Sequence, residues 1–110
     1  MRIWLDDERP APPGWRHETS PSAVIGLISM GFVSEISLDH DLGEGVVGTG
    51  YDVLRWLESR VYAAMNHGVP LDFELPKISI HTANPVARSR MSQAVTSITR
   101  SSSQLSGSDA

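Results

Sequence analysis

The sequence predicts an α/β domain with a mainly parallel sheet of three to four strands. Short apolar runs alternate with longer segments of helical periodicity, which is the pattern of successive strand–helix units. Three of these runs, residues 3–5, 36–38 and 78–80, stop abruptly at polar side chains. Because the carboxyl ends of parallel strands share one edge, where ligands bind in such sheets, we expect the polar side chains to converge there.

Length and composition limit the function classes. With 110 residues, 40% of them hydrophobic and 20% charged, the chain forms one ordinary domain. The absence of cysteine excludes disulfides, thiolate metal sites and cysteine nucleophiles. A net charge of −4 argues against duplex DNA as a partner but allows a small phosphate-containing ligand or an RNA end. No apolar run approaches the roughly 20 residues of a membrane span. We expect a cytoplasmic protein without a membrane partner; its oligomeric state does not follow from the sequence.

The first half of the chain is expected to contain three strands and one helix. Residues 2–5 form a strand, and the prolines and glycine of residues 10–14 exclude a helix directly after it. A short edge strand follows at residues 15–19. Residues 20–31 begin with a Ser-Pro capping pair, continue with helical spacing and end at a glycine. Residues 32–38 form the strand that leads into the acidic cluster.

The second half is expected to contain two helices and one strand. A glycine-rich loop precedes the clearest helix, about residues 50–66, whose apolar side chains repeat with helical periodicity. Residues 77–80 form a strand, and residues 86–100 form the last helix. The serine-rich residues 101–110 have no periodicity, so we expect a disordered tail after a domain that ends at residue 100.

The polar strand ends are predicted to hold a divalent metal ion. Several carboxylates cannot share a small cleft without a cation, because like charges oppose joint ionisation. Oxygen ligands suit Mg²⁺ or Mn²⁺. The expected ligands are Asp6, Asp7, Asp39 and Asp41. Alone, Asp6-Asp7 is better explained as turn and cap residues, and in Asp39-His40-Asp41 alternation turns one or two side chains away from the cleft, so that segment alone favours neither interpretation. It is their occurrence at equivalent strand ends that favours function.

The same cluster carries groups suited to phosphate chemistry. A metal ion there would orient a phosphate and activate water, and His40 or His81 would transfer a proton to the leaving oxygen. Asp39, His40 and His81 are therefore the candidate catalytic residues. Side chains that would bind phosphate follow the first and last strands and begin the last helix, whose N-terminus also favours anions. They are Arg9, Thr82, Asn84, Arg88 and, as a further cation, Arg90.

These residues resemble two related families. The pair Asp6-Asp7, the strand-end Asp39 and Thr82-Ala83 resemble response-regulator receiver domains. That resemblance implies Mg²⁺ on the acidic pair, phosphorylation of Asp39 and a phosphoryl contact from Thr82. The chain departs from receivers in its proline loop and in lacking a final strand with a lysine. It is more similar to cyclic-phosphate processing receiver domains. The matching segments are residues 5–12, 37–43, 50–53 and 81–85, followed by Arg88 and Met91.

The resemblance implies both a fold and an activity. The fold is a shortened flavodoxin-like receiver, a three-layer sandwich with the strand order 2-1-3-4. The activity is metal-dependent hydrolysis of a cyclic phosphate, such as a 2′,3′-cyclic phosphate RNA end or a cyclic nucleotide, with Mg²⁺ or Mn²⁺ as the cofactor. Two alternatives stay open: a signalling receiver phosphorylated on Asp39, and a non-catalytic module that binds a cyclic nucleotide or a partner protein.

Overall fold

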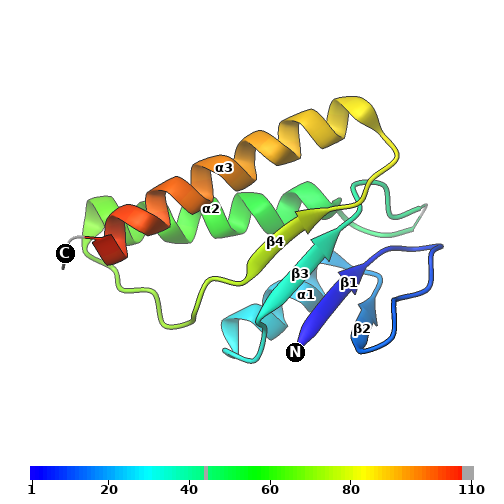
Figure 1. Ribbon diagram of the computed structural model, residues 1–110, viewed down its shortest axis with the longest axis horizontal. Helices are drawn as coiled ribbons and strands as arrows, with labels where there is room; N and C mark the ends of the chain where they lie inside the picture. The colour runs from blue at the N-terminus through cyan, green and yellow to red at the C-terminus, as the bar shows by residue number, and fades with distance from the viewer. Residues whose placement is uncertain (44, 108–110) are drawn as a thin grey trace.

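A computed structural model describes residues 1–43 and 45–107 of the chain (Figure 1). Its four strands form one sheet in which every neighbouring pair is parallel, in the order β2-β1-β3-β4. The strands are β1 (Arg2–Leu5), β2 (Trp15–Glu18), β3 (Glu35–Leu38) and β4 (Lys77–Ile80). The predicted parallel sheet and strand order are confirmed. β3 is shorter than expected, because the chain enters the sheet only at Glu35 and the preceding Phe32 is exposed.

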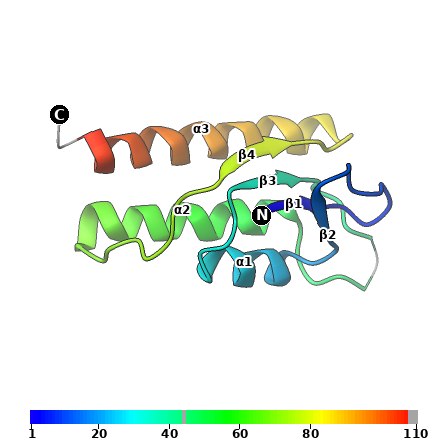
Figure 2. The ribbon, with the colours of Figure 1, turned by 60° about the horizontal axis from the view of Figure 1, so that its bottom comes forward.

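The helices leave one face of the sheet uncovered. They are α1 (Pro21–Ser29), α2 (Gly50–His67) and α3 (Pro85–Gly107). α1 and α2 pack on the same face, and α3 runs beside α2 along the outer edge of β4 (Figures 1 and 2). No helix within residues 1–43 and 45–107 covers the opposite face, so the shortened receiver fold has two layers here instead of the expected three.

Chain direction explains the missing layer. The connections from β2 to β3 and from β3 to β4 advance across the sheet in the same direction, and right-handed crossovers then place their helices on the same side. Only the step from β1 to β2 runs the other way. It is made by a proline-rich loop, which cannot form a helix. The loop ends in a turn in which the N–H of Trp15 donates to the carbonyl of Pro12 at 3.1 Å and Gly14 has φ 85°.

The helix ends follow the local sequence. The hydroxyl of Ser20 accepts the N–H of Ala23 at 3.2 Å and caps α1, as predicted. α2 begins with a capping box in which Thr49 and Asp52 exchange side-chain and backbone hydrogen bonds. It ends at Gly68, whose φ of 67° lies in the left-handed region that favours glycine.

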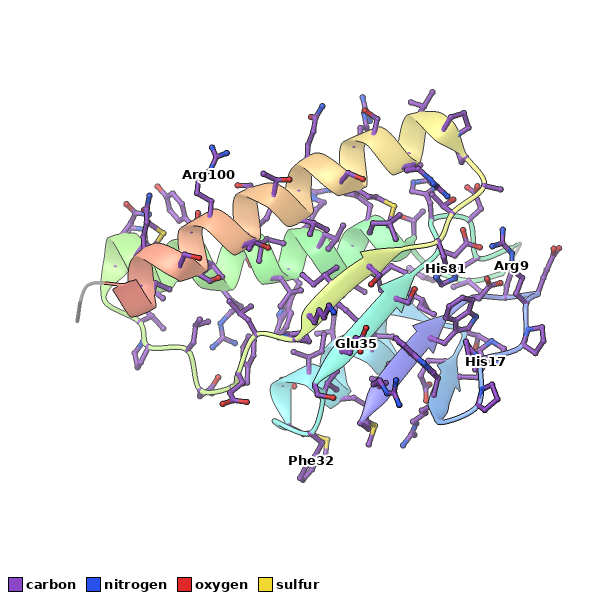
Figure 3. All side chains as sticks on the ribbon, in the orientation of Figure 1. Arg9, His17, Phe32, Glu35, His81 and Arg100 are labelled. Carbon is purple, nitrogen blue, oxygen red and sulfur yellow. The ribbon has the colours of Figure 1, made fainter. Side chains whose placement is uncertain are left out.

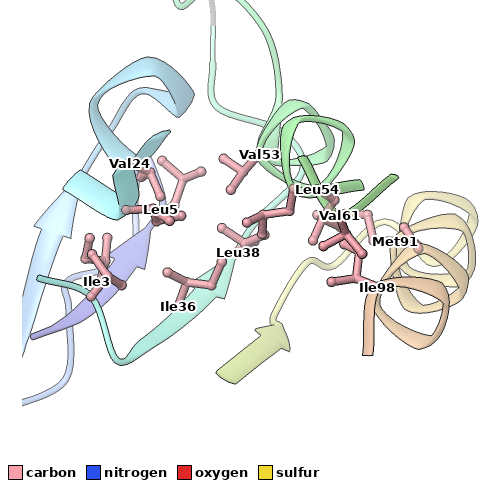
Figure 4. Close-up of a cluster of buried hydrophobic side chains, with 14 of the residues drawn as sticks. Ile3, Leu5, Val24, Ile36, Leu38, Val53, Leu54, Val61, Met91 and Ile98 are labelled. Atoms are coloured by element: carbon pink, nitrogen blue, oxygen red, sulfur yellow. The ribbon is translucent and has the colours of Figure 1, made fainter. Parts of the chain in front are cut away.

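The hydrophobic core lies between the sheet and the helices (Figure 4). Alternate residues of β1 and β3 point toward α1 and α2, and α3 closes the far side of α2 with Met91 and Ile98. Complete burial of one such side chain stabilises the fold by about 1.5–3 kcal/mol. The fully buried aliphatic side chains of the two central strands are Ile3, Leu5, Ile36 and Leu38.

α3 is longer than the sequence predicts. It continues through Gly107, so the expectation of a disordered tail is wrong for residues 101–107. The extra turns are held by Leu105, which packs partly buried against the core, and by the hydroxyls of Ser102 and Ser103, which both donate to the carbonyl of Thr99 at 3.0 Å. The remainder of the predicted tail, residues 108–110, lies outside the described residues.

Candidate metal centre at the carboxyl edge of the sheet

Strands β1, β3 and β4 bring Asp6, Asp39 and His81 together. The last residues of β1, β3 and β4 are in register, so the next residue of each chain segment lies at the same level. Because side chains alternate along a strand, these three point away from the helices and toward the uncovered face. One ligand atom from each lies within 4.8 Å of the others. The two aspartates are buried, with 1% and 8% of their surface exposed.

Asp6 is an ionised carboxylate fixed by its own loop. One oxygen, Oδ1, accepts the backbone N–H groups of Glu8 and Arg9 at 2.8 and 2.9 Å. The other, Oδ2, lies 3.0 Å from Nε2 of His81. Burial acts to raise the pKa of Asp6, but these hydrogen bonds outweigh it and hold the pKa below its ordinary value. The negative charge of Asp6 is therefore present at neutral pH.

His81 is a neutral imidazole whose two ring nitrogens and one ring face all have partners. Burial lowers its pKa below the ordinary value, although Asp6 and Asp39 act to raise it. Since the Asp6 carboxylate only accepts hydrogen bonds, Nε2 carries the proton, and Nδ1 accepts the hydroxyl of Ser37 at 2.7 Å. The ring also stacks on Trp4, with centroids 3.7 Å apart and planes inclined by 4°. Figure 3 shows His81 at the end of the sheet, near Arg9.

Asp39 is positioned by the start of α2. Its Oδ1 accepts the backbone N–H of His40 at 2.8 Å, and its own N–H donates to Leu5 of β1 at 3.0 Å. A Cβ atom built on Gly50 would lie 1.8 Å from the carbonyl oxygen of Asp39. Only glycine allows this contact, so the first residue of α2 lies directly against the backbone of Asp39.

The predicted phosphate-binding residues divide into two groups. Arg9 lies at the cluster, since its Nη1 donates to the carbonyl of His81 at 3.0 Å and its Nε is 3.9 Å from Asp6 Oδ2. The other three are Thr82, Asn84 and Arg88, and they stabilise the loop between β4 and α3. The buried Thr82 hydroxyl accepts the N–H of Asn84, the Asn84 side chain caps α3, and the Arg88 guanidinium donates twice to the Thr82 carbonyl.

Three predicted residues lie outside the cluster. Asp7 and Asp41 are exposed, and neither contributes a ligand atom to the cluster found among the described residues. His40 is 27% exposed, and its Nδ1 lies 2.9 Å from Asp41 Oδ1. It lines a separate pocket together with Arg90, which is exposed on α3.

Sequence reasoning missed the groups that hold His81. Ser37 is 4% exposed and bonds to the ring, and Trp4 stacks on it. The signal was available for Ser37: it is a polar residue inside an apolar run, two residues before Asp39, and so on the same face of the strand. His17 also lies beside the cluster, with Nε2 2.6 Å from the backbone oxygen of Asp6.

The donor set fits a divalent cation. Two carboxylates and one imidazole within a few ångströms are the ligands that Mn²⁺ and related ions accept, and Mg²⁺ is commonly bound by one or two carboxylates with water. The imidazole can take part once its proton moves from Nε2 to Nδ1: the Ser37 hydroxyl oxygen then accepts the Nδ1–H, as the partners of metal-binding histidines usually do, and Nε2 is left to bind the ion. Asp6, Asp39 and His81 therefore form a group that could hold a metal ion.

Comparison with known proteins gives a family match. The model of the family described as "Cyclic-phosphate processing Receiver domain" matches residues 1–97. Neither the curated proteins nor the solved structures contain a significant match. Across the described residues, no helix has both the length and the apolar character needed to cross a membrane.

Proposed function

The chain belongs to the family of cyclic-phosphate processing receiver domains, and from this premise we propose that it hydrolyses a cyclic phosphate with the help of a divalent metal ion. The observation that carries the proposal is the convergence of Asp6, Asp39 and His81 on one edge of the sheet. These three residues would hold the ion. A bound Mg²⁺ or Mn²⁺ would orient the phosphate and lower the pKa of a bound water.

In this proposal Arg9 and His40 act on the substrate. The Arg9 guanidinium is half-exposed beside Asp6, where it can neutralise a phosphate oxygen. The Asp41 carboxylate orients His40 through Nδ1, and Nε2 has no hydrogen-bond partner within residues 1–43 and 45–107. We assign the proton transfer to His40 rather than His81, because both ring nitrogens of His81 are already engaged.

The alternative of a phosphorylated signalling receiver is less well supported. Receivers use a lysine beside the phosphorylated aspartate, as the resemblance implies. The only lysine of this chain, Lys77, begins β4 and therefore lies at the opposite end of the sheet from Asp39.

The test compares Asp39→Asn with Asp41→Asn. Both substitutions remove one negative charge from neighbouring positions, but only Asp39 belongs to the cluster. We expect Asp39→Asn to abolish Mn²⁺ binding, measured by calorimetry, and hydrolysis of 2′,3′-cyclic-phosphate substrates, measured by mass spectrometry. Asp41→Asn should keep Mn²⁺ binding.

Two results would contradict the proposal. One is unchanged turnover in the Asp39→Asn protein. The other is a stable increase in intact mass of about 80 Da, the mass of one phosphoryl group, after incubation with Mg²⁺ and a small phosphodonor, since an aspartate can accept a phosphoryl group covalently. That second result would favour phosphorylation of Asp39.

A further inference from the structure

A pocket of about 650 Å³ lies between α2 and α3, next to the metal-binding edge. Its volume is within the range of small-molecule sites. Tyr51, Arg55 and Glu58 line it from α2, spaced three or four residues apart and so on one face of the helix. Arg90 and Gln93 line it from α3. The two helices run side by side along this wall (Figure 1).

His40 joins this pocket to the candidate metal centre. It lines the pocket, and its backbone N–H donates to Asp39 Oδ1 at 2.8 Å. Consecutive Cα atoms are about 3.8 Å apart, so the wall of the pocket and the metal-site carboxylate belong to the same strand end. Side chains alternate along the strand, so a ligand whose phosphate lies at Asp39 on the uncovered face would pass over the end of β3, beside His40, to enter the pocket on the helix side.

The lining residues suit a nucleoside better than a polyanion or a lipid. Arg55 and Arg90 have no ion-pair partner in the described part of the chain, and they face the carboxylate of Glu58 and the amide of Gln93 in the same pocket. Charges of both signs argue against a track for several phosphates. Donors, acceptors and the half-buried ring of Tyr51 are instead the groups that recognise the edges and face of a base.

We infer that this pocket is the nucleoside subsite of the enzyme, so that the substrate is a nucleoside cyclic phosphate, either free or as the last nucleotide of an RNA. The inference rests on the proposed function. It separates the two parts of the substrate: the cyclic phosphate lies at the metal centre, and the base and ribose lie between α2 and α3.

The experiment uses Arg55→Gln and Arg90→Gln, with Arg100→Gln as the matched control. Arg100 is also an exposed arginine of α3, and it lies on none of the described pockets (Figure 3). The probes are adenosine 2′,3′-cyclic phosphate and glycerol 1,2-cyclic phosphate, which share the reacting ring but differ in the base and sugar. A charge-assisted hydrogen bond contributes enough that each pocket variant should raise KM for the adenosine probe about tenfold. The glycerol probe should be unaffected, and Arg100→Gln should change neither value.

Calorimetry with adenosine 2′,3′-cyclic phosphate separates this inference from the proposed function. Binding that is lost in the pocket variants supports the subsite even when no turnover occurs, in which case only the hydrolytic proposal fails. Equal effects of the variants on the two probes, or no effect on either, would overturn the subsite. A short RNA ending in the same cyclic phosphate then distinguishes the two sources: an Arg90→Gln effect on its KM supports the subsite for RNA ends, and an effect confined to the mononucleotide supports it for free nucleotides.

Discussion

Replacing Gly50 by alanine should push the start of α2 away from the end of β3, where Asp39 lies. The added Cβ would meet the carbonyl oxygen of Asp39 at 1.8 Å and the carbonyl carbon at 2.9 Å. Both atoms are backbone, so no side chain can rotate away, and the two segments must move apart by roughly 1 Å. Overpacking of this kind costs about 1–3 kcal/mol, and the better helix propensity of alanine offsets at most about 1 kcal/mol. We expect a net loss of about 2 kcal/mol in the free energy of unfolding.

Urea denaturation of Gly50→Ala and Gly26→Ala provides the measurement. Gly26 lies within α1, and a Cβ built there meets nothing within 4 Å. This control should gain about 0.5–1 kcal/mol, because alanine loses less conformational entropy than glycine on folding. Gly50→Ala should also weaken Mn²⁺ binding, since the backbone of Asp39 must shift. The reasoning is refuted if Gly50→Ala is as stable as Gly26→Ala.

Three further predictions concern the residues in and around the cluster. Ser37→Ala should lower Mn²⁺ affinity about 10–100-fold by removing the partner of His81 Nδ1. Ser79→Ala, at the paired position of β4, should change it little, and equal losses in calorimetry would contradict this role. Without metal, the lowered pKa of His81 means that the unfolded chain binds its proton first. The free energy of unfolding should therefore decrease as pH falls below 6.5, toward the folded-state pKa. His81→Gln should flatten this part of the urea midpoint–pH curve; an unchanged slope would refute the assignment. The pKa of Asp6 is lowered from 3.8, so its carboxylate stabilises the folded state above that pH, and this contribution is lost as the pH falls further. Asp6→Asn should remove this acid-induced decrease in the urea midpoint.

The sequence predicted most of the fold because its signals are local. Alternating apolar segments, the Ser20 cap and the glycine after α2 each act within a few residues, and all of them are confirmed. The end of α3 was missed because serine-rich composition suggested disorder. Its last turns are supported by Leu105, which packs partly buried against the core, and composition alone does not show such packing.

The candidate site was predicted only in part, for a related reason. Three polar strand ends indicated a convergent cluster, and Asp6, Asp39 and His81 do meet. The sequence does not show which residue of Asp6-Asp7, or which residue of the segment 39–41, faces the cluster. Register between strands and alternation along them point Asp6 to the cluster and leave Asp7 exposed.

By itself, the sequence determined the parallel α/β class, the approximate positions of the strands and helices and the edge of the sheet where the polar side chains gather. These follow from periodicity, capping and the common direction of parallel strands. Only the tertiary structure decided which side chains form the cluster, the support of His81 by Ser37 and Trp4, and the uncovered face of the sheet. Each of these depends on how segments far apart in the chain are aligned across the sheet, and that alignment is fixed by packing against the core.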